Sequence, residues 1–71
     1  MISNRDYLQY LQQVLAIEIQ MEQTYRQMVD SLTNAEYINV FQGLMEAEQA
    51  HQAKVREIMK YFEKGSSGIN V

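Results

Sequence analysis

Apolar residues recur every three or four positions along two long stretches of this chain, the spacing of one face of a helix. The first stretch begins at Ser3, which reads as an N-cap with Asp6 in the first turn, and continues to about Leu32. The second continues to about Lys64. Proline is absent and two of the three glycines lie in the last seven residues, which suits long helices. The pattern predicts two long helices.

A short capping sequence separates the two stretches. In Thr33-Asn34-Ala35-Glu36, the spacing predicts Thr33 as an N-cap and Glu36 at the third helical position. Gly65 is a natural C-terminal cap for the second helix. We therefore expect an all-α fold, with an antiparallel two-helix hairpin over residues 1–64 and a flexible C-terminal tail over 65–71.

Ionisable side chains interrupt each apolar stripe near its middle. An ionised carboxylate buried without a partner costs several kcal/mol or shifts its pKa until it is neutral, and a divalent cation removes that cost. If the turn centres on Thr33, Glu18 and Glu48 lie level with each other on facing helices. The predicted stripes are Leu11, Val14, Glu18, Met21, Tyr25, Met28 and Leu32, then Tyr37, Phe41, Leu44, Glu48, His51, Val55, Ile58 and Phe62.

The interrupting residues form part of a metal ligand set. Glu48 and His51 are three residues apart and share a helix face, with Glu18 opposite. Carboxylate and imidazole ligands suit iron or manganese. One hairpin supplies too few ligands for a two-metal centre and leaves one side of its stripes uncovered. A second copy would supply the four glutamates and two histidines of di-iron helical bundles, so we expect a homodimer that forms a four-helix bundle.

On these residues the chain resembles the ferritin-like superfamily in its rubrerythrin-type branch, and is similar to the encapsulated ferritins. In that family a glutamate lies thirty residues before a Glu-x-x-His motif and a tyrosine follows it by seven; here these are Glu18, Glu48, His51 and Tyr25. The resemblance covers about residues 7–62. It implies a ferroxidase that oxidises Fe²⁺ to Fe³⁺ at a di-iron centre between two chains, with Mn or Zn as substitute metals. Glu48 would bridge the metals, Glu18 and His51 would complete the ligand set, and Tyr25 would donate a hydrogen bond or an electron.

The resemblance also has implications for partners. Encapsulated ferritins carry a tail that docks into an encapsulin shell, and the segment from Gly65 to Ile69 loosely resembles such a docking peptide. It therefore implies a homo-oligomer, an encapsulin shell as partner and a cytoplasmic location inside that compartment. Ile17 and Gln20 stand where the family often has further acidic residues.

Composition excludes several other classes of function. A net charge of −3 and a pI near 4.9 argue against nucleic-acid binding. The longest apolar run, Val14 to Ile17, is too short to span a membrane. Cysteine is absent, which removes thiolate metal sites and rubredoxin-type electron donors.

Several alternatives remain open from the sequence. The chain could be a rubrerythrin-like peroxide reductase, or a non-catalytic helical dimerisation module in which the polar residues fix register. Glu22, one turn beyond Glu18, could be the inward carboxylate, although its heptad position predicts the flank. Tyr25 could be a core tyrosine. The methionines at 21, 28, 45 and 59 are most simply flexible core filler, and the numerous glutamines are most simply helix surface.

Overall fold

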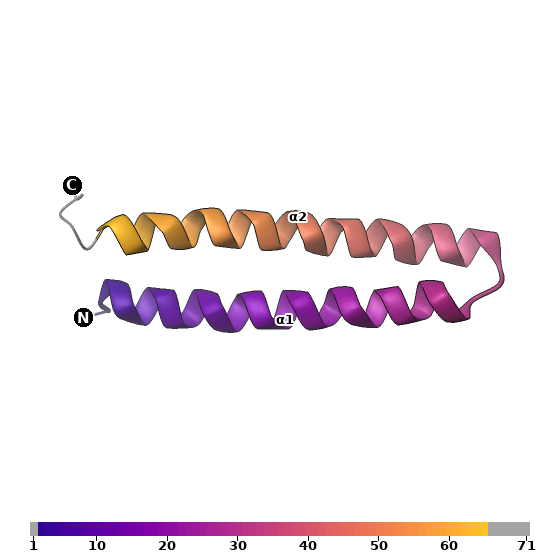
Figure 1. Ribbon diagram of the computed structural model, residues 1–71, viewed down its shortest axis with the longest axis horizontal. Helices are drawn as coiled ribbons and strands as arrows, with labels where there is room; N and C mark the ends of the chain where they lie inside the picture. The colour runs from indigo at the N-terminus through magenta and orange to yellow at the C-terminus, as the bar shows by residue number, and fades with distance from the viewer. Residues whose placement is uncertain (1, 66–71) are drawn as a thin grey trace.

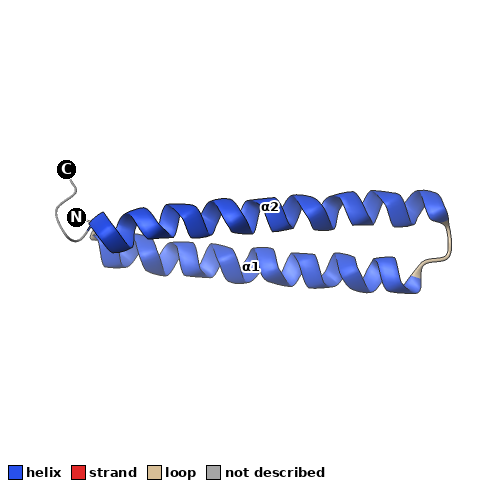
Figure 2. Cartoon of the chain, turned by 45° about the horizontal axis from the view of Figure 1, so that its top comes forward, coloured by secondary structure: helices blue, strands red, loops and turns tan. Residues whose placement is uncertain are grey.

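Two antiparallel helices make up the described part of the chain, residues 2–65 of this computed structural model (Figure 1). Helix α1 is Asn4–Ser31 and α2 is Ala35–Gly65, and the described residues contain no strand. The hairpin is an elongated rod with principal extents of 52 × 16 × 15 Å. The predicted all-α fold and the packing of two helices against each other are confirmed (Figure 2). The predicted tail from residue 66 onward lies outside the described residues.

The start of α1 matches the capping sequence. The Ser3 side chain accepts a hydrogen bond from the Asp6 N–H at 3.2 Å, and the Asp6 carboxylate accepts one from the Ser3 N–H at 3.1 Å. This reciprocal capping box provides partners for two backbone donors that the helix itself leaves unpaired.

The start of α2 differs from the prediction by one residue. Asn34 is the N-cap in place of Thr33: its Oδ1 accepts hydrogen bonds from the N–H groups of Glu36, at 2.9 Å, and Tyr37, at 3.2 Å. Its carbonyl accepts from the Ile38 N–H at 3.0 Å, which begins the helical ladder. Asparagine is among the strongest N-cap residues, and here it caps the helix in place of the threonine before it. The turn still centres on residue 33.

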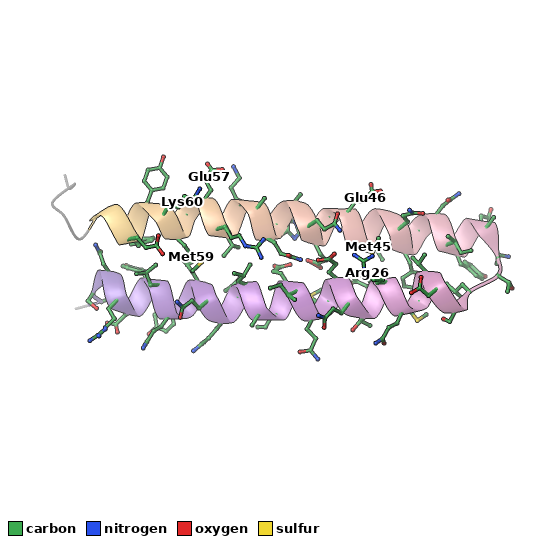
Figure 3. The ribbon with its side chains drawn as sticks, in the orientation of Figure 1. Arg26, Met45, Glu46, Glu57, Met59 and Lys60 are labelled. Carbon is green, nitrogen blue, oxygen red and sulfur yellow. The ribbon has the colours of Figure 1, made fainter. Side chains whose placement is uncertain are left out.

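The seam between the helices follows a heptad pattern in alternating steps of three and four residues. Met45 and Met59 of α2 point toward α1, whereas Glu46 and Glu57 point away (Figure 3). Tyr7 stacks on Phe62, with ring centroids 4.9 Å apart, at the open end of the hairpin. The seam residues, buried or half-buried, are Leu8, Leu11, Leu15, Glu18, Glu22, Tyr25, Val29 and Leu32, then Ile38, Phe41, Met45, Glu48, Gln52, Val55, Met59 and Phe62.

Half of each predicted stripe therefore lies beside the seam and not in it. The apolar arc on each helix is wider than one neighbouring helix can cover, and the hairpin buries the half that runs through Leu15 and Met45. The other half remains exposed, as Val14, Met21 and Leu44 illustrate. The predicted seam is wrong for these positions because sequence periodicity gives the width of an apolar arc and not which part meets the first partner.

The exposed large apolar residues of the two helices lie on one flank of the hairpin, which we call the outward apolar face. Its residues all fall at two heptad positions on the same flank of the seam, and equivalent positions of antiparallel helices lie on the same side. Only Val55 is a buried apolar residue in the described chain, so the hairpin by itself has almost no core. The face consists of Tyr7, Tyr10, Val14, Ile17, Met21, Met28, Tyr37, Val40, Leu44, Ile58 and Tyr61.

Within residues 2–65, neither helix carries an apolar stretch long enough to cross a membrane.

Candidate metal centre

Glu18, Glu48 and His51 come together near the middle of the two helices. One ligand atom from each lies within 4.8 Å of the others. The Nδ1 atom of His51 is 3.4 Å from Oε1 of Glu18 and 3.3 Å from Oε1 of Glu48. Glu48 and His51 share a face because they are three residues apart on α2, and α1 brings Glu18 to the same level. The three residues predicted as ligands are thus neighbours in space.

The exposed fraction of the side chains in the cluster increases from the interior of the hairpin to its surface. The Glu48 side chain is 7% exposed, that of Glu18 is 20% exposed and that of His51 is 61% exposed. His51 lies on the flank that carries the outward apolar face, between Leu44 and Ile58 along α2. The cluster therefore opens onto that face.

The two carboxylates influence each other's protonation. The Glu18 carboxyl group, followed by burial, raises the pKa of Glu48 above its ordinary value, although His51 opposes this shift. Hydrogen bonding to Glu48 and then to Glu18 raises the pKa of His51, against a smaller opposing effect of burial. Both shifts mean that the metal-free site holds protons more tightly than free side chains do, because negative charge is concentrated there. A bound cation would compensate the same charge.

The heptad position of Glu22 in the predicted stripe indicates the solvated flank of the helix. The structure does not place Glu22 there. It lies in the seam on the opposite side from His51, with its side chain 17% exposed. Its Oε1 accepts from Gln52 Nε2 at 2.8 Å, and its Oε2 accepts from Gln49 Nε2 at 2.8 Å and from an Arg26 Nη at 2.9 Å. These donors hold the pKa of Glu22 below its ordinary value, the two glutamine amides contributing most. Glu22 is thus an inward carboxylate that carries its own set of donors.

Tyr25 lies in the seam but away from the ligands. Its ring packs against Phe41 with centroids 6.1 Å apart. Seven residues of helix separate it from Glu18, a rise of about 10 Å. Among the described residues, no hydrogen bond joins Tyr25 to the cluster. The structure places it as a half-buried aromatic side chain of the seam, on the same strip of α1 as Glu18.

A shallow depression on α1 lies beside the cluster. It is lined by Ile17, Gln20, Met21, Thr24 and Tyr25. The first four residues have the spacing i, i+3, i+4 and i+7, the four-residue hole that receives one side chain of a facing helix in knobs-into-holes packing. Ile17 and Gln20 thus both line this depression.

Comparison of the chain with protein-family models, with curated proteins and with solved structures finds no match. The family resemblance therefore depends on the spacing of four residues, and the chemistry of the site has to be judged from its geometry.

The donor set fits a divalent first-row metal. Two carboxylates and one imidazole, converging within 4.8 Å, are hard and borderline ligands of the kind that hold iron, manganese or zinc. The buried Glu48 carboxylate has a second carboxylate and an imidazole as neighbours but no lysine or arginine contact among the described residues. Such a group gains from a cation more than an exposed one does.

Sequence reasoning misses the glutamines. Gln52 is 6% exposed, as deeply buried as Glu48, and Gln49 reaches across the hairpin to Glu22. The sequence pattern assigns both to the helix surface because glutamine is common there. The available signal is position: Gln52 lies four residues after Glu48, on the same helix strip.

Proposed function

We propose that this protein is an iron-binding ferroxidase of the encapsulated-ferritin type, which oxidises Fe²⁺ to Fe³⁺ at a centre formed between two chains. The observation that carries the proposal is the convergence of Glu18, Glu48 and His51 within 4.8 Å at mid-height of the hairpin. Of the ionisable side chains in the described part of the chain, these alone form a group with metal-ligand composition and spacing.

The outward apolar face supports a second copy as the missing half of the site. Eleven large apolar side chains are exposed on it, more than a monomeric hairpin of this size ordinarily leaves in water. The ligand cluster sits near the middle of the face along its length. A two-fold axis through that point would place two clusters against each other, giving four glutamates and two histidines, while the apolar ends cover one another.

In this proposal Fe²⁺ is the substrate, and the residues bind, orient and neutralise it. Glu48, the most buried of the three ligands, would bind the metal from the interior of the hairpin. Glu18 and His51 complete the set from either side. Each Fe²⁺ gives up one electron, and dioxygen takes two electrons and two protons to become hydrogen peroxide. Carboxylate and imidazole ligands accommodate both oxidation states of iron. We assign Tyr25 an auxiliary role as a nearby redox-active side chain, not as a ligand.

A container for the product follows from the size of the hairpin. A rod of 52 × 16 × 15 Å has no interior that could hold a mineral, so Fe³⁺ storage requires a larger compartment. We propose an encapsulin shell in the cytoplasm as that compartment. The segment that would dock into it lies outside the described residues.

One observation favours a second candidate, a metal-free dimerisation module. His51 Nδ1 contacts both carboxylates at 3.3 and 3.4 Å, so a proton on this ring would pair with Glu18 and Glu48 without any metal. The trio would then be a buried polar layer that fixes the register of a helical dimer.

Metal analysis separates these two candidates. The chain is purified without chelator, its bound metals are quantified, and Fe²⁺ oxidation is followed by absorbance with dioxygen as oxidant. We expect about one metal per chain at saturation, two for each dimer, and oxidation that stops when bound Fe²⁺ is consumed. Sustained turnover only with hydrogen peroxide and a reductant would indicate a rubrerythrin-like peroxide reductase. A stable dimer that binds no Fe²⁺, Mn²⁺ or Zn²⁺ would support the dimerisation module and overturn the ferroxidase proposal.

A further inference from the structure

The seam contains a second polar group beside the ligand cluster, and the two groups meet at Gln52. The Gln52 side chain lies one turn beyond Glu48 on α2, and each residue is 6% exposed. Its Nε2 is 2.8 Å from Oε1 of Glu22 and 3.5 Å from the main-chain oxygen of Glu18, both on α1. Gln52 thus bridges the helices directly next to the cluster, on the side of Glu48 away from His51.

A buried amide group close to a carboxylate with free acceptor positions would ordinarily bond to it. Glutamine and a carboxylate four residues apart on a helix are within hydrogen-bonding reach. A donor without a partner in a buried site costs about 1–3 kcal/mol, so the Gln52 amide must find an acceptor. Glu48 would be available as that acceptor. A hydrogen bond from Gln52 would occupy a lone pair of the Glu48 carboxylate that a cation needs. It would also weaken the attraction of that carboxylate for the cation.

Glu22 provides the Gln52 amide with a stronger alternative. Its carboxylate is ionised and accepts three short bonds, from Gln52, Gln49 and Arg26 at 2.8, 2.8 and 2.9 Å. Bonds to an ionised acceptor are roughly twice as strong as neutral ones. With three donors on its two oxygens, Glu22 is poorly suited to bind a metal itself. The inward carboxylates of Glu22 and Glu48 therefore have opposite surroundings. Glu22 accepts three N–H donors, whereas the polar side chains beside Glu48 in the described residues are Glu18 and His51.

We propose that Glu22 is a positioning residue for the cation site: it holds the Gln52 amide toward α1 and so keeps it away from Glu48. This inference rests on the proposed function, because the benefit is a Glu48 carboxylate left open for a metal. Glu22 acts through Gln52 and contacts neither the cation nor its ligand atoms.

Four variants of the full chain test this role. Glu22→Leu removes the acceptor, and Glu22→Gln is the matched control that keeps an acceptor oxygen. Gln52→Met removes the donor. Glu22→Leu combined with Gln52→Met removes both. Circular dichroism and sedimentation check that each variant keeps the helix content and assembly state of the wild-type chain.

The first readout uses metal-free protein. Nuclear Overhauser contacts of the Gln52 side-chain amide protons are expected to Glu22 in the wild-type chain and to Glu48 in Glu22→Leu. A wild-type spectrum with contacts to Glu48 and none to Glu22 overturns the proposal without any variant.

The second readout is Co²⁺ affinity, measured by titration of chelator-treated protein. We expect Glu22→Leu to weaken Co²⁺ binding about 10-fold, the lower end of the effect of changes around metal ligands. Glu22→Gln should bind within about 2-fold of wild type, because the introduced side-chain amide retains an acceptor oxygen for Gln52. The double variant should recover the affinity of Gln52→Met, because no amide then remains to compete. An unchanged affinity in Glu22→Leu, or an equal loss in the double variant, overturns the proposal.

The two readouts distinguish this proposal from the function on which it rests. Wild-type protein that fails to bind Co²⁺, Fe²⁺ or Mn²⁺ overturns the metal site and the positioning role together, even when the amide moves as expected. Wild-type protein that binds Co²⁺ while the amide of Glu22→Leu stays on α1 overturns the positioning role alone.

Discussion

His51 on α2 contacts Glu18 on α1, with Nδ1 3.4 Å from Oε1, although thirty-three residues separate them in the chain. The same nitrogen lies 3.3 Å from Glu48, so one imidazole links both helices at the level of the two carboxylates. This contact requires the helical hairpin to be in register, because a slip of one turn would move Glu18 about 5 Å along α2. The register of the hairpin and the composition of the site are therefore set together.

Removing any of the three ligands should abolish metal binding. Glu18→Ala, Glu48→Ala and His51→Ala each delete one ligand per chain, and two per dimer if the site lies between chains. We expect their Co²⁺ affinity to fall by more than the roughly 10- to 100-fold that changes around metal ligands cost, and Fe²⁺ oxidation to be largely lost. Isothermal titration and stopped-flow absorbance measure the two quantities.

Glu46→Ala is the matched control for these variants. Glu46 lies on α2 two residues before Glu48 but points away from α1 (Figure 3). Its loss should leave affinity and oxidation unchanged. If Glu46→Ala and Glu48→Ala behave alike, general negative charge and not the cluster attracts the metal.

The hairpin, the turn and the ligand trio can be predicted from the sequence because each rests on local or additive signals. Capping residues and a long proline-free apolar pattern specify helices, and the position of the turn then brings Glu18 close to Glu48. Which apolar residues of each helix face the other helix cannot be predicted in the same way. Val14 and Leu15 are both apolar, and only the packing of two helices decides that Leu15 is half-buried while Val14 is exposed.

Glu22 shows the same limit for polar residues. Its neighbours in the sequence give no indication that Gln49 and Gln52, from the other helix, bind it at 2.8 Å. Glutamine has no strong preference for interior or surface until its partner is known. A long-range amide bond can be predicted only after the register and the seam are both correct.

The stability of the metal-free hairpin should fall as pH rises above about 6.5. The pKa of His51 is raised above its ordinary 6.5 in the folded chain. The contribution of its protonated form is complete below the unfolded pKa and is lost as pH rises through the folded pKa. Glu48, whose pKa is raised above its ordinary 4.5, acts in the same direction. Thermal unfolding of chelator-treated protein by circular dichroism, from about pH 6 to about pH 8.5, measures this decline.

Two comparisons check the origin of that pH dependence. His51→Gln keeps a polar side chain that does not titrate and should flatten the profile above pH 6.5. Metal-loaded protein should show the opposite slope, because a proton on His51 or Glu48 competes with the cation. A metal-free wild-type midpoint that rises over the same pH range contradicts the assignment. Below 4.5 a separate loss is expected, because Glu22 has a lowered folded pKa and its contribution disappears as it protonates.

Gly43→Ala should stabilise the hairpin by about 0.5–1 kcal/mol. Gly43 lies inside α2, and a Cβ placed there meets nothing within 4 Å. Alanine therefore costs no steric strain and removes the backbone entropy that glycine loses on folding. Urea unfolding measures the change. Ala53→Gly, at an exposed position of the same helix, is the reverse control and should destabilise by a similar amount. A destabilised Gly43→Ala would indicate that a second chain approaches the α2 backbone at this position.

A glutamate introduced on the outward apolar face should both dissociate the dimer and weaken metal binding. Ile17 is 60% exposed and lines the four-residue hole beside Glu18, and Leu44 is 40% exposed on α2. Glutamate at either position would be buried without a partner in a face-to-face dimer, a cost of several kcal/mol. We expect Ile17→Glu and Leu44→Glu to sediment as monomers with weakened Co²⁺ binding. Gln42→Glu adds the same charge on the opposite flank of α2 and should remain dimeric.

Because metal would bind the dimer more tightly than the monomer, Co²⁺ should also shift the wild-type equilibrium toward the dimer by linkage. Glu18→Ala should shift the metal-free equilibrium the same way, since it removes one of the facing carboxylates from each chain. If the variants with glutamate at residue 17 or 44 remain dimeric, the partner binds on another surface of the hairpin. The metal centre would then need ligands from a chain other than that partner.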